Sequence, residues 1–209
     1  MNQSSLSVII PTLNEAAHLD PLLNRLVDRP GIEVIVVDGG STDDTERVVA
    51  KYPSVSMIHS AQGRGIQLNQ GAEAAKFESF WFLHADSSIP PGWMDEIHQA
   101  LKEPQVVAGC FRLQFDDNHC LLRLFSFFSR WNHSLVTYGD QGYFMKRSVF
   151  QAIGGFQDYP ILEDVEIQCR LRKLGKWKKL TLCLTTSARR FRTMGILRQQ
   201  LKNIGIVSL

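Results

Sequence analysis

The sequence predicts an α/β protein built on a doubly wound, mostly parallel sheet, and three observations lead to this fold class. Short apolar runs alternate with segments of helical spacing through the first hundred or so residues, which is the pattern of β-α-β units. The runs themselves show little alternation, as is typical of strands buried on both faces of a parallel sheet. Two of them end on an aspartate followed by glycine or serine, which marks the loop edge where such sheets bind ligands.

The first half of the chain supplies four of these units. Leu6–Ile10 is a short apolar strand, and four leucines then repeat with the spacing of an amphipathic helix over Glu15–Asp28. Pro30 and Gly31 end that helix. The same reasoning predicts strands at Glu33–Val37, Val55–Ile58 and Phe80–Ala85, and helices at Asp44–Lys51, from Gly63 to about Lys76, and at Gly92–Lys102.

The pattern changes in the second half. Val106–Phe115 is a longer strand with partial alternation, and the helical segment Cys120–Val136 follows it. Further strands are expected at Tyr143–Lys146 and Trp177–Leu184, and helices at Val149–Gly155 (with a glycine turn), Glu163–Leu174 and Ile196–Ile206. We expect one domain over residues 1–209, with a nucleotide-binding half at about 1–103 and a second half at about 104–209 on the same sheet.

The bulk composition is that of an ordinary globular protein. The chain has 209 residues, of which 44% are hydrophobic and 21% charged, and its net charge of +2 does not suggest a nucleic-acid partner. None of the four cysteines forms a C-x-x-C pair, which argues against a zinc site and for free thiols in a reducing cytoplasm. We expect no signal peptide and no transmembrane segment, and a cytoplasmic location.

The most apolar later segment is Cys120–Trp131. Arg123 and Arg130 interrupt it, and it is too short to span a bilayer. It is interpreted as a core helix or as the helix of a homodimer, with contact at the inner membrane face as the alternative. Basic residues also gather at 170–179 and 187–198, where contacts with anions or a membrane surface are to be sought.

Three common nucleotide and hydrolase signatures are missing. The sequence has no G-x-G-x-x-G after the first strand, no phosphate-binding G-x-x-x-x-G-K-[ST] and no G-x-S-x-G. Instead, polar residues follow successive strands, and parallel strands bring them to one edge: Asn14, Glu15, Asp38, Arg64 and Asp86. Glu15 and Asp38 fit a base or ribose, Arg64 a phosphate, and Asp86 a Mg²⁺ or Mn²⁺ ion. The alternatives are a turn-shaping Asp38, a solvated Arg64 and a helix-capping Asp86.

Five segments carry a family resemblance: SVIIPTLNE at 7–15, VIVVDGGSTDDT at 34–45, GRGIQLNQGA at 63–72, FLHADSSIP at 82–90 and ILEDVEIQCRLRKLG at 161–175. Together they resemble a family 2 glycosyltransferase of the GT-A fold, a Rossmann-like three-layer sandwich. The spacing at 63–72 and the His-Ala-Asp sequence are most similar to a small bacterial subgroup of arsenosugar-biosynthesis-type glycosyltransferases. The resemblance implies a nucleotide-diphosphate sugar as donor and a hydroxyl group of unknown origin as acceptor.

The resemblance also assigns roles to single residues. It implies that the nucleotide pocket is lined by Pro11, Asn14, Glu15 and Asp38, and that the diphosphate lies near Arg64 and Asn69. Arg189 and Arg190 resemble a short form of an arginine motif that holds the diphosphate. Asp86 matches the last acid of the D-x-D metal motif, whose first position is His84 here. A neutral imidazole ligates Mn²⁺ better than Mg²⁺, so the metal is expected mainly on Asp86.

The same resemblance places the chemistry in the second half of the chain. Asp164 takes the general-base position of an inverting, metal-assisted transfer, and Glu163 beside it is expected to orient the acceptor. A helix start favours the ionised carboxylate that a base needs. Asp140 and Gln141, between Gly139 and Gly142, are expected on the acceptor side, with a simple turn as the alternative. The rival functions are a non-catalytic nucleotide-sugar-binding relative and a nucleotidyltransferase.

Overall fold

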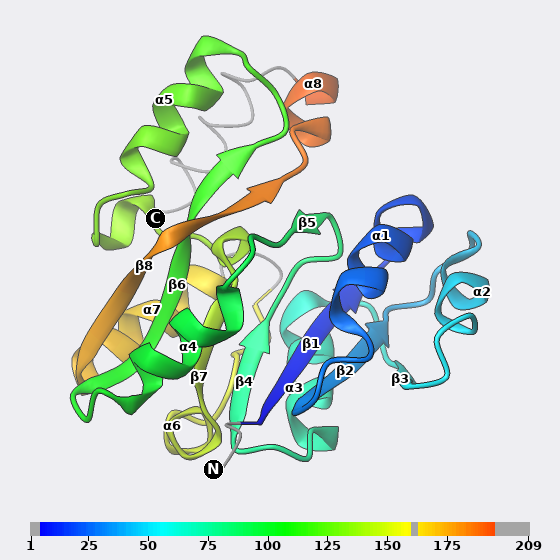
Figure 1. Cartoon of the computed structure of the whole chain (residues 1–209), viewed down its shortest axis with the longest axis horizontal. Helices are drawn as coiled ribbons and strands as arrows, with labels where there is room; N and C mark the ends of the chain where they lie inside the picture. The colour runs from blue at the N-terminus through cyan, green and yellow to red at the C-terminus, as the bar shows by residue number, and fades with distance from the viewer. Residues whose placement is uncertain (1–4, 160–162, 195–209) are drawn as a thin grey trace.

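A computed structural model describes residues 5–159 and 163–194 of the chain. Its centre is one sheet of eight strands in the order β3-β2-β1-β4-β7-β6-β8-β5 (Figure 1). The strands are β1 Leu6–Thr12, β2 Ile32–Asp38, β3 Val55–His59, β4 Ser79–Phe82, β5 Ser87–Ser88, β6 Val106–Phe115, β7 Tyr143–Lys146 and β8 Lys176–Thr186. The sheet therefore runs without a break from the first half of the chain into the second.

The first four strands are parallel, and the second half of the sheet is mixed. β2 pairs in parallel with β1 and β3, and β1 pairs in parallel with β4. β7 is antiparallel to both β4 and β6, while β6 and β8 are again parallel to each other. The register sets Thr12 opposite Asp38 and Asp38 opposite His59, so the first three strands end level with one another. The α/β class and the mostly parallel sheet are confirmed.

Helices cover both faces of the sheet and make a three-layer sandwich. The helices are α1 Ala16–Leu26, α2 Thr45–Val49, α3 Arg64–Ala74, α4 Trp93–Lys102, α5 Cys120–Phe128, α6 Arg147–Ala152, α7 Glu163–Leu174 and α8 Arg189–Met194, with short 3₁₀ turns η1 Ser134–Val136 and η2 Gly139–Gln141. One buried cluster joins the sheet to α1, α2 and α4, and a second joins it to α3, α6 and α7. The four leucines of α1 are all buried, as their spacing predicts.

Gly71 lets α3 lie close against the sheet. A Cβ atom at this position would stand 2.4 Å from Cγ2 of Ile9 and 3.0 Å from Cγ2 of Val37. Glycine costs about 1 kcal/mol in a helix relative to alanine, so close packing on β1 and β2 explains its place here. This contact fixes the distance between the amino end of α3, where Arg64 lies, and the carboxyl ends of the strands.

The strand predicted at Phe80–Ala85 is shorter than expected. β4 stops at Phe82, although Leu83 and Ala85 are still 0% and 4% exposed. The chain then turns and Ser87–Ser88 forms the edge strand β5, antiparallel to β8. The prediction was wrong there because an apolar run reports burial, and burial continues past the last hydrogen-bonded residue. The turn carries His84 and Asp86 away from the sheet and over its carboxyl edge.

The helix predicted at Cys120–Val136 is interrupted. α5 ends at Phe128, and Ser129 instead bonds the backbone of β6: its Oγ accepts from Leu113 N at 2.9 Å and donates to Leu113 O at 3.1 Å. α8 was not predicted, and the helix expected at 196–206 lies outside the described residues. α5 and α8 lie together over the extended ends of β6 and β8 (Figure 1). In the described part of the chain, no helix has the length and apolar character needed to cross a membrane.

Candidate functional site

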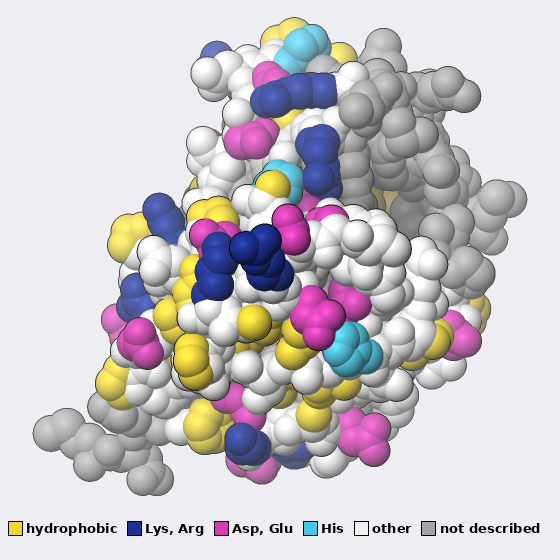
Figure 2. Space-filling model, turned by 90° about the vertical axis from the view of Figure 1, so that its right-hand side faces the viewer, with side chains coloured by type: hydrophobic (Ala, Val, Ile, Leu, Met, Phe, Trp, Pro, Cys, Tyr) yellow, Lys and Arg dark blue, Asp and Glu magenta, His cyan; other side chains and the backbone are white. Residues whose placement is uncertain are grey.

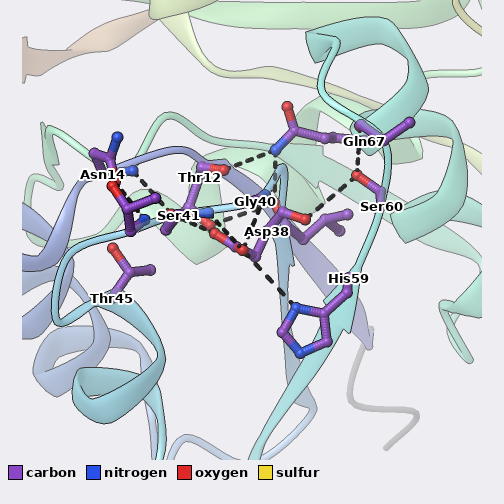
Figure 3. Close-up of polar contacts among 12 residues, drawn as sticks. Thr12, Asn14, Asp38, Gly40, Ser41, Thr45, His59, Ser60 and Gln67 are labelled. Atoms are coloured by element: carbon purple, nitrogen blue, oxygen red, sulfur yellow. Dashed lines mark hydrogen bonds and ion pairs between the residues drawn. The ribbon is translucent and has the colours of Figure 1, made fainter.

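The loop after β2 is built around the Asp38 carboxylate (Figure 3). Its Oδ2 accepts from Gly40 N at 3.0 Å and Ser41 N at 2.9 Å, and its Oδ1 accepts from the Ser41 hydroxyl. His59 at the end of β3 lies 3.8 Å away, from Nδ1 to the same Oδ2. Asp38 is 4% exposed, so it shapes the turn, as one of the two interpretations predicts. Its contact with a base or ribose stays a prediction.

Asn14 joins the loop after β1 to the loop after β2. Its Oδ1 accepts from Thr42 N at 2.8 Å, and its own N–H donates to the Ser41 hydroxyl at 2.9 Å. Asn14 has a φ of 56°, in the left-handed region where asparagine is among the best-tolerated residues after glycine. The two loops therefore form one rigid ledge at the carboxyl edge. Pro11 lies in β1 opposite Val37, directly below this ledge.

Gln67 holds the two strands together beneath the ledge and was missed by sequence reasoning. Its Nε2 donates to Thr12 O at 2.9 Å and to Val37 O at 2.8 Å, and the residue is 4% exposed. A Cβ atom at Gly39 would stand 3.1 Å from this side-chain amide, which explains the glycine after Asp38. A polar residue on the buried face of a predicted helix was the available signal.

A second cluster forms around Arg64 at the start of α3. Its Nε donates to Glu163, its Nη2 lies 3.5 Å from Oδ2 of Asp164, and its Nη1 lies 3.3 Å from Nε2 of His84. Although burial lowers it, the charges of Asp164 and Glu163 raise the pKa of Arg64 above its ordinary value. A guanidinium only donates, so the His84 ring accepts at Nε2. The cluster brings together four predicted site residues from three loops.

The Asp164 carboxylate is held against η2 by a backbone hydrogen bond. Gly139 N donates to its Oδ2 at 2.6 Å, and Val165 N donates to its Oδ1 at 2.9 Å. A Cβ atom at Gly139 would stand 3.0 Å from Cβ and 3.1 Å from Oδ2 of Asp164. Only glycine permits this approach without displacing the carboxylate. Asp164 is 8% exposed at the amino end of α7, where the helix dipole stabilises its charge.

Asp140 is a second carboxylate near Asp164, and its environment differs from that of Asp164. Its Oδ1 is sealed from solvent and has no hydrogen-bond partner within the described chain. Burial first, and then the charges of Asp164 and Asp86, raise its pKa to about 7, against the opposing charges of Arg64 and Lys179. Asp86 therefore lies within electrostatic reach of Asp140, and the Asp140 carboxyl can hold a proton near neutral pH.

Gln141 lies behind the cluster. It is 1% exposed, its Nε2 donates to Val136 O at 2.8 Å, and its Oε1 accepts from Lys179 Nζ and lies 3.4 Å from Cys110 Sγ. Burial lowers the pKa of Lys179 and raises that of the Cys110 thiol. Gln141 therefore supports η2 from within the fold, and a direct acceptor contact would require this amide to leave its partners.

Asn69 is bonded on both sides of its amide to the backbone of Phe156. Its Nδ2 donates to Phe156 O at 2.8 Å and its Oδ1 accepts from Phe156 N at 2.9 Å, which ties α3 to the loop after α6. It lines a cavity of about 360 Å³ between α3 and α6. The Arg64 cluster lines a separate small cavity with Leu68, Phe82 and Tyr143. The structure thus gives Asn69 a bracing role, and its contact with a diphosphate stays a prediction.

Arg189 connects the end of the chain to its beginning. Its Nη2 lies 2.8 Å from Oε1 of Glu15, a contact between residues 174 positions apart. Glu15 also lies 3.2 Å from His18 Nδ1 through its Oε2. The side chain of Arg190 lies outside the described part. Glu15 and Arg189 therefore join the start of α1 to α8, and their nucleotide and diphosphate contacts stay predictions.

The groups present at the edge suit a hard divalent cation that a phosphorylated ligand helps to hold. Among the described residues, no three His, Cys, Asp or Glu side chains converge on a common metal position. Mg²⁺ and Mn²⁺ are commonly held by one or two carboxylates, water and substrate phosphates rather than by a full protein cage. A metal there would be held by carboxylate oxygens of Asp86 and Asp140, whereas Nε2 of His84 already contacts Arg64.

Figure 2 shows the face of the molecule that carries β3 and α2. Acidic and basic side chains are interspersed over the described part of this face. Lys51 pairs with Asp20 there at 3.1 Å, and the exposed edge of the sheet ends in His59. The ion pairs of the carboxyl edge differ from these in having a largely buried carboxylate, with Glu163 and Glu15 at 4% and 11% exposed.

Comparison with solved structures places the fold in a known class. The chain superposes on S. aureus TarS in complex with UDP with a TM-score of 0.73 at 19% identity, covering 88% of this chain and 60% of that chain. It superposes on glucosyl-3-phosphoglycerate synthase of Mycobacterium tuberculosis, in complex with Mn²⁺, UDP and glucosyl-3-phosphoglycerate, with a TM-score of 0.70 at 19% identity, covering 97% and 81%. The fold is that of the GT-A glycosyltransferases.

Comparison of sequences then defines the family. The model of Glycosyl transferase family 2 matches residues 7–154, and the chain belongs to this family. An uncharacterized glycosyltransferase of Nostoc sp. is 29% identical over 122 residues, which cover 54% of this chain and 38% of the relative. The chain spans about a third to a half of the length of the curated relatives it matches.

Proposed function

We propose that this chain transfers a sugar from a nucleotide-diphosphate donor to an acceptor hydroxyl, with a divalent metal ion and with Asp164 as the general base. The observation that carries the proposal is the convergence of Arg64, His84, Glu163 and Asp164 at one point of a family 2 fold. A cation, a proton acceptor and a metal-binding loop are thereby within reach of one ligand.

The donor lies across the ledge in this proposal. Asn14, Glu15 and Asp38 face the nucleoside, and Arg64 and Arg189 face the diphosphate. TarS has been crystallised with UDP and with UDP-GlcNAc, which supports a nucleotide at the corresponding edge of this chain. The rigid turn around Asp38 favours binding, because the loop loses little conformational freedom when the ligand arrives.

Charge balance supports the metal. The named groups at the edge are six acids (Glu15, Asp38, Asp86, Asp140, Glu163 and Asp164) against three cations (Arg64, Arg189 and Lys179). A diphosphate adds further negative charge to a site that is already acidic. Asp86, with Asp140 near it, would hold Mg²⁺ or Mn²⁺, which neutralises the departing diphosphate when bound. The relative from M. tuberculosis was crystallised with Mn²⁺ and UDP.

The proposed transfer step uses Asp164 as the acceptor of the proton. The acceptor oxygen bonds to the anomeric carbon, the bond from that carbon to the diphosphate oxygen breaks, and the acceptor proton passes to Asp164. The diphosphate leaves with the electron pair of the broken bond. A single displacement of this kind inverts the anomeric centre. Glu163, paired with Arg64, orients the acceptor side, and Gly139 keeps the Asp164 carboxylate in place.

A thermal-shift panel tests the proposal. Nucleoside diphosphates of different bases are added with Mn²⁺, with Mg²⁺ or with a chelator, and a ligand at about 100 times its dissociation constant should add about 2.7 kcal/mol of stability. Asp86→Asn should remove the metal-dependent part of the shift, whereas the exposed Asp28→Asn should leave it unchanged. The proposal fails if no nucleotide shifts the melting temperature with either metal.

The identity of the acceptor depends on the subgroup to which the chain belongs. The similarity to arsenosugar-biosynthesis-type enzymes rests on residues 63–72 and on the His-Ala-Asp sequence, and the subgroup stays a prediction.

Turnover of a sugar nucleotide without release of pyrophosphate separates transfer from the nucleotidyltransferase alternative. Metal-dependent donor hydrolysis separates an enzyme from a relative that only binds the nucleotide.

A further inference from the structure

α5 packs into the molecule with one face only. Leu122 is 1% exposed and joins Leu113 and Phe115 in a buried cluster, and the ring of Phe125 lies 6.5 Å from that of Phe191 in α8. The Ser129 hydroxyl then closes the helix end on the backbone of β6. These contacts account for the inner face of the helix.

The outer face is also apolar. Leu124, Phe127, Trp131 and Leu135 are 45%, 49%, 55% and 60% exposed. Leu124 and Phe127 are neighbours on the outer face of α5, and the ring of Trp131, just past the helix end, lies 6.3 Å from the ring of Phe127. We call this stripe, with Leu135 of η1 beyond it, the α5–η1 face. Four large exposed apolar side chains so close together in the chain mark an interaction surface rather than scattered surface residues.

Two arginines frame the α5–η1 face. Arg123 and Arg130 are both exposed, and the Arg130 guanidinium lies 5.4 Å from the centroid of the Phe127 ring. The sequence has no Asp or Glu between Asp117 and Asp140. Asp116 and Asp117, at the near end, are paired with Arg192 of α8. The stripe is therefore apolar with a positive border.

From this combination we infer that the α5–η1 face docks the chain on an anionic lipid surface. Trp and Arg side chains each have an apolar part that enters the interface and a polar tip that stays with the headgroups. A second copy of this chain fits less well, because a two-fold interface sets the same patch against itself and would oppose Arg123 and Arg130 with arginines. α5 lies at the end of the molecule beyond the carboxyl edge of the sheet (Figure 1), so docking brings that edge towards the lipid.

Vesicle sedimentation tests this inference without any assay of sugar transfer. The full chain is mixed with vesicles of phosphatidylcholine alone or with phosphatidylglycerol added. We expect binding only to the anionic vesicles, and less of it at high salt. Each basic residue near such a surface contributes about fivefold to partitioning, so Arg123→Gln/Arg130→Gln should weaken binding about 25-fold. Phe127→Ser/Trp131→Ser should weaken it by about tenfold or more.

Matched controls come from other exposed residues. Leu174→Ser removes an apolar side chain that is 55% exposed at the end of α7, and Arg47→Gln removes an exposed arginine of α2. Both should bind vesicles as the unchanged chain does. Equal binding by the α5–η1 variants and the controls would overturn the inference. The inference would also be overturned if neither the unchanged chain nor any variant bound vesicles, while light scattering showed that the unchanged chain forms a dimer which Phe127→Ser/Trp131→Ser loses. A retained nucleotide thermal shift in every variant keeps the two proposals separate.

Discussion

Replacing Asp140 by asparagine should change how the stability of the chain depends on pH. Burial and the charge of Asp164 raise the pKa of the Asp140 carboxyl from 3.8 to about 7. Between these two values the native chain keeps a proton that the unfolded chain has released. Because the unfolded state binds fewer protons in this window, the free energy of unfolding falls as the pH rises from about 4 to about 7.

The size of this effect follows from the same shift. A pKa raised by about 3 units corresponds to about 4 kcal/mol at pH values above 7, since each unit is worth about 1.4 kcal/mol. This is an upper limit, because the residue as a whole is only half-buried and water screens part of the interaction. We expect the free energy of unfolding of Asp140→Asn, relative to that of the unchanged chain, to rise by about 2 kcal/mol between about pH 4.5 and about pH 7.5.

Urea unfolding at several pH values measures the difference directly. The unchanged chain, Asp140→Asn and the exposed control Asp28→Asn are unfolded side by side. Groups far from position 140 contribute alike in all three proteins and cancel, so the comparison reports Asp140 together with the charges coupled to it. The reasoning is refuted if the difference between Asp140→Asn and the unchanged chain stays constant to within about 0.5 kcal/mol over this range.

Three further substitutions test the site and its support. The asparagine of Asp164→Asn can still accept from Gly139 N, so this variant should fold. Its rate of sugar transfer should fall by about 10²–10⁴-fold in a turnover assay. The control Glu166→Gln, on the same helix, should keep a near-normal rate. Gly139→Ala should lower turnover and keep the nucleotide thermal shift, because its Cβ atom would stand 3.0 Å from Cβ of Asp164. Gly71→Ala should lose about 1–3 kcal/mol in urea unfolding, because a Cβ atom 2.4 Å from Ile9 Cγ2 overpacks the core; a gain in stability would contradict this.

The fold was predictable where a local pattern decides the structure. The leucine spacing of α1 and the unbroken apolar strands β1 and β2 follow directly from burial on one or both faces. Burial does not decide where a strand ends, as Leu83 and Ala85 show by staying buried outside β4. The edge strand β5 has only two residues, and its existence depends on β8, which lies almost a hundred positions later. No local pattern carries that information.

The site was predictable as a set of positions and not as a set of contacts. Polar residues after parallel strands share an edge by topology, so Asp38, Arg64 and Asp86 could be placed there from sequence. The partner of Arg64, however, is Glu163, 99 positions away. The amide of Gln67 bridges two backbone carbonyls that no pattern connects with it. Such pairings depend on the assembled sheet, and a sequence window does not contain them.

The cations of the carboxyl edge already have carboxylate partners, and this bears on how the donor binds. Arg64 pairs with Glu163 and Asp164, and Arg189 pairs with Glu15. A diphosphate must either take these guanidinium groups from their partners or arrive with a cation of its own. In each pair a largely buried carboxylate meets a guanidinium that is 33% or 43% exposed, so taking the guanidinium away leaves the carboxylate without this partner. A divalent ion that arrives with the diphosphate supplies positive charge without that cost. We therefore expect donor binding to depend strictly on a divalent metal ion, with His84 at the position where the family resemblance implies the first residue of a metal motif.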